Sequence, residues 1–228
     1  MAGRRDNRTD RSGSSRPAQG EAGPLTPPVL RVDRGRPNPD AQEVALAALR
    51  REDLVLYPSD TVYGILCPAR SRQAVKRLRV LKGYVAQRPF ILLMSSLEMA
   101  ERLSTGLKGE AGELARKHWP GPLTLVLPAT EEVPAWVRSE REEVAVRYPD
   151  DDLATSLVGT LQTPLISTSA NRKDDSPPLS LSEVPPEIRE QCSVVLDAGE
   201  LCEGEPSTIV RVTGSGIQIL RQGLLRLD

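Results

Sequence analysis

From about residue 38 onward, short apolar runs typical of strands alternate with amphipathic stretches typical of helices. This alternation predicts an α/β fold, a single domain built around one twisted, mixed, open sheet. Ligands of such sheets usually bind where strands end. Strands are expected at residues 54–57, 90–94, 123–127, 144–146, 165–166, 194–196, 208–212 and 217–220, and helices at 38–51, 71–83, 96–103, 109–117 and 153–161.

Two of these helices carry end signals. Asn38 followed by Pro39 is typical of an N-cap with proline in the first turn. Ser71 is a second expected N-cap, and Gly83 is expected to end the helix that Ser71 begins.

The bulk composition excludes several classes of function. The chain has 228 residues, with 30 Lys and Arg against 31 Asp and Glu, so any basic site must be local. Three cysteines without a C-x-x-C pair, and one histidine, argue against a disulfide framework or a histidine-based metal site. No apolar run approaches the ~20 residues of a membrane span, and the N-terminus has no secretory apolar region. We therefore predict a cytoplasmic protein that binds no membrane.

Residues 1–28 differ from the rest of the chain. They are rich in Arg, Ser, Gly and Pro and have almost no apolar periodicity. This composition predicts a disordered basic tail, with the folded domain at residues 29–228. A solvated tail is the favoured interpretation, and a weak nucleic-acid tether is the alternative.

Polar clusters follow several of the expected strands. Each has an ordinary interpretation as a turn, a helix end or a rigid corner, and a second one as a ligand-binding loop. The sequence has no G-x-x-x-x-G-K-[ST] loop and no G-x-G-x-x-G, so any nucleotide site would be a scattered basic cleft. The clusters are PSDTVYG at 58–64, KGY at 82–84 with Arg88, HWPGPLT at 118–124, VAVR at 144–147, STSAN at 167–171, and PST at 206–208 with Arg221.

Taken in order, these clusters resemble the YrdC/YciO family. PSDTVYG is similar to the P-T-[DE]-T-V-Y-G motif of that family, and LKG at 81–83 to the start of its K-G-R-P motif. WPGPLT at 119–124, VAVR, STSAN, PSTIV at 206–210 and ILRQG at 219–223 resemble its later motifs. The resemblance covers roughly residues 38 to 225.

The resemblance implies an α/β fold with a deep basic cleft. It also implies a nucleotidyltransferase activity, L-threonylcarbamoyladenylate synthase. Such an enzyme joins L-threonine, bicarbonate and ATP, with Mg²⁺ on the ATP, and releases pyrophosphate. The product serves the threonylcarbamoyladenosine (t6A) modification of certain tRNAs, so tRNA and other proteins of that modification are implied partners.

The resemblance also implies roles for particular residues. The catalytic groups are expected to be Lys82 and Arg88, while no residue is expected to hold a metal. The expected ATP-binding residues are Lys82, Tyr84, Arg88, Ser169, Asn171 and Arg221, and the expected threonine-binding residues are Thr61, Arg147, Ser167 and Ser207.

The chain departs from the family pattern at three positions. Tyr84 stands where the family usually has Arg, Leu93 where many members have His, and Glu143 where Thr is usual. These departures keep open a second interpretation, a paralogue that binds nucleotides or double-stranded RNA with weak or no synthase activity. A purely structural partner in a tRNA-modification complex is a third.

Overall fold

The computed structural model describes residues 26–36, 38–84, 89–202, 204–213 and 216–227. Residues 1–25, which form most of the predicted tail, lie outside the described residues, and so does Arg88. Pro28 was assigned to the tail, yet its carbonyl accepts a hydrogen bond from the amide of Val195 at 3.0 Å. The contacts of the domain therefore begin before residue 29.

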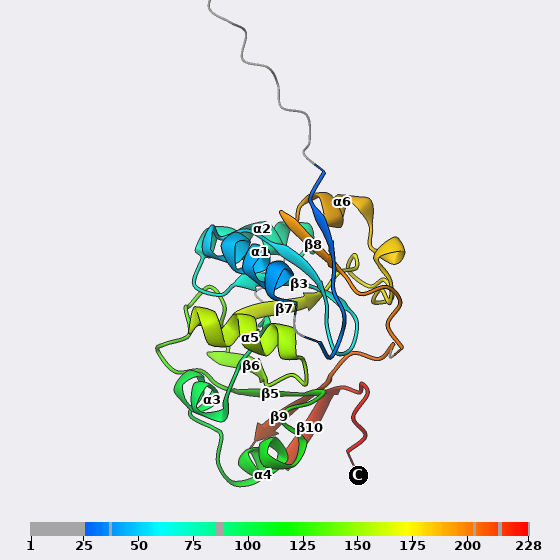
Figure 1. Cartoon of the computed structure of the whole chain (residues 1–228). Helices are drawn as coiled ribbons and strands as arrows, with labels where there is room; N and C mark the ends of the chain where they lie inside the picture. Colours follow the sequence, from blue (N-terminus) through cyan, green and yellow to red (C-terminus); the bar gives the residue numbers. More distant parts are fainter. Residues whose placement is uncertain (1–25, 37, 85–88, 203, 214–215, 228) are drawn as a thin grey trace, which may run out of the picture.

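The described residues form one mixed sheet with the strand order β1-β8-β2-β3-β7-β4-β6-β5-β9-β10 (Figure 1). Parallel pairs such as β4 with β6 occur beside antiparallel pairs such as β3 with β7. The α/β fold with a mixed open sheet is thus confirmed. The strands are β1 (Val29–Arg31), β2 (Val55–Pro58), β3 (Tyr63–Pro68), β4 (Ile91–Leu93), β5 (Leu123–Pro128), β6 (Glu143–Arg147), β7 (Leu165–Ser169), β8 (Val194–Asp197), β9 (Thr208–Thr213) and β10 (Gly216–Arg221).

Helices cover the sheet and leave the strand ends accessible. Helix α1 packs beside α5 and also contacts β2, β3 and β8, while α2 packs on β3 and α4 on β5 (Figure 1). The central strands β2 and β3 are buried along their whole length. The helices are α1 (Pro39–Arg50), α2 (Arg72–Leu81), α3 (Leu97–Leu103), α4 (Gly109–His118), α5 (Asp152–Leu161) and α6 (Pro186–Glu190), with a 3-10 turn at Leu181–Glu183.

The predicted end residues of α2 are confirmed, whereas the predicted side-chain cap of α1 is wrong. Ser71 caps α2, because its side chain accepts a hydrogen bond from the amide of Ala74 at 3.1 Å. Gly83 follows α2 with a φ of 61°, which favours glycine. Asn38 does occupy the N-cap position of α1, but its side chain makes no cap. It bonds instead to the backbone of Asp33 and Arg36 in the preceding loop.

Strands β1 and β3, helix α6 and the 3-10 turn were not predicted. Residues 58–64 were expected to form one loop, but β3 already begins at Tyr63, so the loop is short. Strand β3 is buried on both faces, so its sequence lacks the apolar–polar alternation by which a strand is usually recognised.

The short loop between β2 and β3 matters for the site, because it holds Ser59 to Val62 at the end of β2.

No helix in the described ranges is both long and apolar enough to cross a bilayer. The described residues also contain no group of three or more His, Cys, Asp or Glu side chains arranged to hold a metal ion.

Candidate active site

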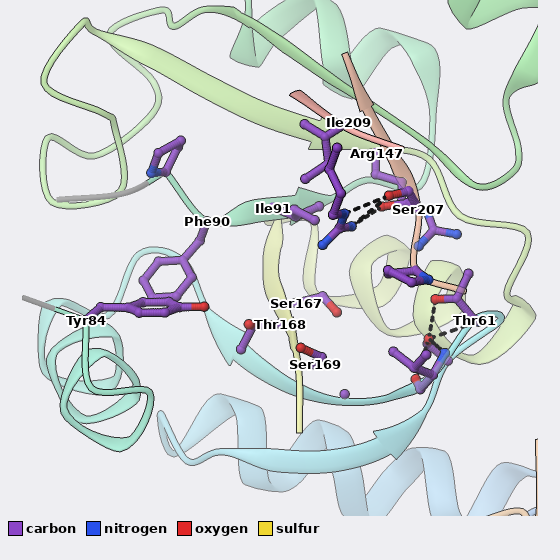
Figure 2. A pocket seen from close by; sticks show the side chains of 16 residues that line it. Thr61, Tyr84, Phe90, Ile91, Arg147, Ser167, Thr168, Ser169, Ser207 and Ile209 are labelled. Atoms are coloured by element: carbon purple, nitrogen blue, oxygen red, sulfur yellow. Dashed lines mark hydrogen bonds between the residues drawn. The ribbon is translucent and has the colours of Figure 1, made fainter. Parts of the chain in front are cut away.

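A polar pocket of about 240 Å³ lies where the ends of β2, β6 and β7 meet the start of β9 (Figure 2). Among its described lining residues the charged groups are two arginines, Arg147 and Arg221, and none is a carboxylate. Such a lining favours an anionic ligand. The lining consists of Ser59, Thr61, Val62, Gly64, Tyr84, Pro89, Phe90, Ile91, Arg147, Ser167, Thr168, Ser169, Pro206, Ser207, Ile209 and Arg221.

The turn after β2 is held by the hydroxyl of Ser59. This Oγ donates to the carbonyl of Val62 at 2.7 Å and accepts from the amides of Thr61 and Val62, both at 3.1 Å. The side chain of Thr61 lies 3.1 Å from the same Oγ. Thr61 therefore meets the pocket from a fixed backbone, which suits a residue that orients a small ligand.

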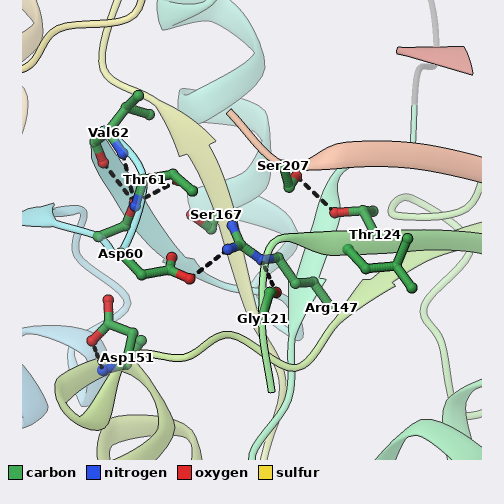
Figure 3. A network of polar contacts seen from close by, with 12 residues as sticks. Asp60, Thr61, Val62, Gly121, Thr124, Arg147, Asp151, Ser167 and Ser207 are labelled. Atoms are coloured by element: carbon green, nitrogen blue, oxygen red, sulfur yellow. Dashed lines mark hydrogen bonds and ion pairs between the residues drawn. The ribbon is translucent and has the colours of Figure 1, made fainter. Parts of the chain in front are cut away.

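Arg147 ends β6 and is almost buried, with 7% of its side chain exposed. Its Nε donates to the carbonyl of Gly121 at 3.0 Å, and its Nη2 pairs with Oδ2 of Asp60 at 2.5 Å (Figure 3). The Trp119–Thr124 corner supplies that carbonyl, so the corner is structural, as one of its two interpretations predicted, and it also holds a residue of the pocket lining in place. Trp119 packs beneath the corner and donates its Nε1–H to the carbonyl of Leu123 at 2.7 Å.

Arg221 lies on β10 and reaches across to Ser207. Its Nη2 donates to the Ser207 carbonyl at 2.7 Å, and the same nitrogen lies 3.2 Å from the Ser207 hydroxyl. That hydroxyl also lies 2.9 Å from Oγ1 of Thr124. Burial and then the nearby charge of Arg147 lower the pKa of Arg221. Because the two positive charges act on each other, an anion bound between Arg147 and Arg221 would be stabilised.

The expected ATP-binding residues Lys82 and Asn171 are buried and do not line the pocket. The ammonium of Lys82 donates to the carbonyl of Ser169 at 2.8 Å, to the carbonyl of Asn171, and to Oδ1 of Asn171 at 3.0 Å. Burial lowers the pKa of Lys82 to about 8. In this structure Lys82 joins the end of α2 to the end of β7, and so fixes Ser169 in the lining.

The other predicted ligands among the described residues lie in the lining itself. Ser167 reaches it with its hydroxyl 2.9 Å from the hydroxyl of Tyr57. Tyr84 lies beside Phe90, with ring centroids 5.8 Å apart. Figure 2 places these two rings at the opposite end of the pocket from Arg147 and Ser207.

The other two departures from the family pattern lie outside the lining. Leu93 is buried in β4, where it pairs with Arg147 across the sheet. Glu143 forms an ion pair with Arg211 of β9 at 2.9 Å. Of the three departures, only Tyr84 changes the wall of the pocket.

Sequence reasoning missed two residues, Asp60 and Thr124, that contact side chains of the pocket lining. Asp60 pairs with Arg147 across 87 positions of sequence, and Thr124 contacts Ser207 across 83. Both lie inside motifs that were noted, but a motif does not show which partner a side chain meets.

The family model described as "Telomere recombination", the Sua5/YciO/YrdC model, matches residues 47–223. The chain belongs to this family. A protein named threonylcarbamoyl-AMP synthase from Pyrococcus abyssi is 36% identical over 185 residues, which cover 81% of this chain and 54% of that protein. One of the same name from Xanthomonas axonopodis is 34% identical, covering 78% of this chain and 95% of that protein.

Solved structures of the Sua5/YciO/YrdC family show the same fold. The crystal structure of P. abyssi Sua5 complexed with L-threonine matches with a TM-score of 0.79 and 34% identity, covering 86% of this chain and 57% of that one. Escherichia coli YciO matches with a TM-score of 0.80 at 22% identity, covering 87% and 96%, and supports the fold alone. The chain therefore spans little more than half the length of the P. abyssi relative, but nearly the whole length of the Xanthomonas one.

Proposed function

We propose that this chain is a threonylcarbamoyl-AMP synthase. The observation that carries the proposal is a pocket whose described charged lining is two arginines among hydroxyl groups, in a chain 34% identical to a protein crystallised with L-threonine. The substrates are L-threonine, bicarbonate and ATP. The products are threonylcarbamoyl-adenylate and pyrophosphate, which would serve tRNA modification in the cytoplasm together with other proteins of that process.

The chemistry requires little of the protein beyond positioning. The amine of threonine and bicarbonate give a carbamate and water, and a carbamate oxygen then attacks the α-phosphorus of ATP. The new O–P bond forms as the bond to the β-phosphate breaks, and pyrophosphate leaves. Since the substrate supplies its own nucleophile, the arginines act by orienting groups and by neutralising developing charge.

The two ends of the pocket suggest how the substrates lie. Arg147, Thr61, Ser167 and Ser207 would bind threonine, with the guanidinium facing its carboxylate. Arg221 and Ser169 would face the phosphates, and Tyr84 would face the adenine. Lys82 and Asn171 would act through Ser169, unless ATP draws the ammonium away from its carbonyl partners. Arg88 remains a predicted catalytic phosphate ligand.

Mg²⁺ would accompany ATP and be held mainly by phosphate oxygens, as is common for this ion. This assignment agrees with a described pocket lining that offers hydroxyls and guanidinium groups but no carboxylate.

The direct test is pyrophosphate release by the purified chain with ATP, bicarbonate and L-threonine. We expect release that stops when either threonine or bicarbonate is omitted. Mass spectrometry should detect threonylcarbamoyl-adenylate in the same reactions. Release that is independent of threonine, or absent, would contradict the proposal.

Tyr84 is expected to bind ATP by stacking. Its ring lies in the lining against Phe90, and aromatic–base stacking contributes about 1–3 kcal/mol per base. Tyr84→Ala should therefore weaken ATP binding by roughly fivefold or more, while Tyr84→Phe should bind nearly as well as the wild type. Calorimetry with a non-hydrolysable ATP analogue checks both. Equal loss in both variants would mean that the hydroxyl, and not the ring, makes the contact.

Tyr84 also favours a second candidate function, a nucleotide- or double-stranded-RNA-binding paralogue with weak or no synthase activity. The residue lines the pocket where the family usually has Arg. Tyr84→Arg separates the two candidates. A strong rise in threonine-dependent turnover would show that the natural pocket is attenuated, and unchanged turnover would favour the synthase.

A further inference from the structure

The contacts of Arg147 leave one edge of its guanidinium for a ligand. Nε is occupied by the Gly121 carbonyl and Nη2 by Asp60, whereas the described residues show no hydrogen bond to Nη1. The Asp60 side chain is only 9% exposed and does not line the pocket. Asp60 therefore contacts Arg147 at Nη2 from outside the pocket lining.

The second oxygen of Asp60 is buried and has no partner among the described residues. The same holds for Oδ2 of Asp151, whose Oδ1 caps α5 by accepting from the amide of Ala154 at 2.9 Å. Figure 3 shows Asp60 between Arg147 and Asp151. A buried acceptor without a donor is costly, and a proton on Asp151 would make its free oxygen part of a neutral carboxyl group.

The charges around Asp151 support a proton at this place. Burial, and then the negative charge of Asp60, raise the pKa of Asp151 to about 6, against the lowering effects of its bond from Ala154 and of Arg147 and Arg34. The charge of Asp151 also acts on the phenol of Tyr57, whose pKa is raised, first of all by burial, so that the phenol stays neutral. An added proton is thus assigned to Asp151.

We propose that Asp60 positions Arg147 for the carboxylate of the amino-acid substrate, and that the buried carboxyl of Asp151 takes up a proton on the oxygen that lacks a partner. The first half rests on the proposed function. Asp60 acts through Arg147. The Asp60 carboxylate and the Gly121 carbonyl together fix the guanidinium plane, and this leaves Nη1 for the substrate. The opposite possibility is that Asp60 competes with the substrate for Arg147.

Asp60→Asn tests the positioning role. The amide has nearly the same shape but loses the charge that aligns Arg147. We expect the Kd and KM for threonine to rise about tenfold, with kcat at saturating threonine and the affinity for ATP changed by less than about threefold. Asp150→Asn is the matched control, since Asp150 is an exposed neighbour of Asp151 and loses the same charge. Unchanged threonine affinity in Asp60→Asn would overturn the positioning role, and tighter binding would show competition.

Asp151→Asn tests the proton on Asp151 without any substrate. A folded-state pKa raised above the unfolded value contributes stability below about pH 4 that is lost as the pH rises through about 6. Asparagine caps a helix as well as aspartate does, and it cannot titrate. The melting temperature of Asp151→Asn relative to wild type should therefore be higher at pH 7 than at pH 4.5.

An equal difference at both pH values would overturn the proton on Asp151 even if Asp60→Asn fails to fold. If the wild type shows no threonine-dependent turnover but the melting temperatures behave as expected, the proposed function fails while the proton on Asp151 stands.

Discussion

Arg147→Lys is expected to weaken threonine binding by about tenfold or more, roughly 1.4 kcal/mol or above. Lysine keeps the charge, but its single ammonium cannot hold the Gly121 carbonyl and Asp60 at once and also present a planar edge to a carboxylate. A bidentate fork has that geometry. ATP binding should change much less, because Arg221 faces the phosphates in the proposed arrangement.

Calorimetry with threonine and with an ATP analogue, each alone, separates the roles of the two arginines. Arg138→Lys is a suitable control, since Arg138 pairs with Glu142 and does not line the pocket. If Arg147→Lys loses ATP affinity while threonine affinity is kept, then Arg147 is a phosphate ligand and the proposed division of the pocket is reversed.

Gly223→Ala is expected to destabilise the protein by at least about 2 kcal/mol, which lowers the melting temperature by roughly 4–8 °C. A Cβ at this position would lie 2.1 Å from the Pro206 carbonyl oxygen and 2.6 Å from the carbonyl carbon of Ser207. Both are backbone atoms, so no side-chain rotation can relieve the contact. The segment after β10 must then move away from Ser207, and Arg221 with it.

The consequence for the site can be measured beside the thermal unfolding. Gly223→Ala should weaken binding of both substrates, because Ser207 and Arg221 meet where the two segments touch. Gly159→Ala is the matched control. It lies inside α5, its Cβ would meet nothing closer than Ser95 at 3.8 Å, and replacing a helical glycine by alanine stabilises by roughly 0.5–1 kcal/mol. Equal melting temperatures for the two variants would contradict this account of Gly223.

The helices were predictable because their signals are local. Ser71 and Gly83 bound α2 as expected, and leucines spaced four apart predicted α5. Strand β3 was not predicted, because it is buried on both faces and begins directly after a polar turn. Asn38 shows a related limit: a capping residue was placed correctly by the pattern, but its side chain found better partners in the preceding loop.

Which residues line the pocket was easier to predict from the sequence than which side chains contact one another there. Most of the described residues proposed as ligands lie in the lining, since strand ends gather them there. Lys82 and Asn171 are the exceptions, and they bond to each other. A lysine at a helix end beside a glycine gives no indication that its ammonium turns inward to the Ser169 carbonyl of β7, 87 positions later. Long-range pairs of this kind also include Asp60 with Arg147, which no local pattern specifies.

The strand order bears on when the pocket can exist during synthesis. Strand β3 pairs with β7 about a hundred residues later, β8 joins the opposite end of the sheet from β9, and β9 and β10 follow the other described strands in the sequence. The lining residues Pro206, Ser207, Ile209 and Arg221 thus leave the ribosome after the other described walls of the pocket. A nascent chain can bury most of its core while its substrate site is still open on one side. The described pocket therefore first becomes complete only once residue 221 has left the ribosome.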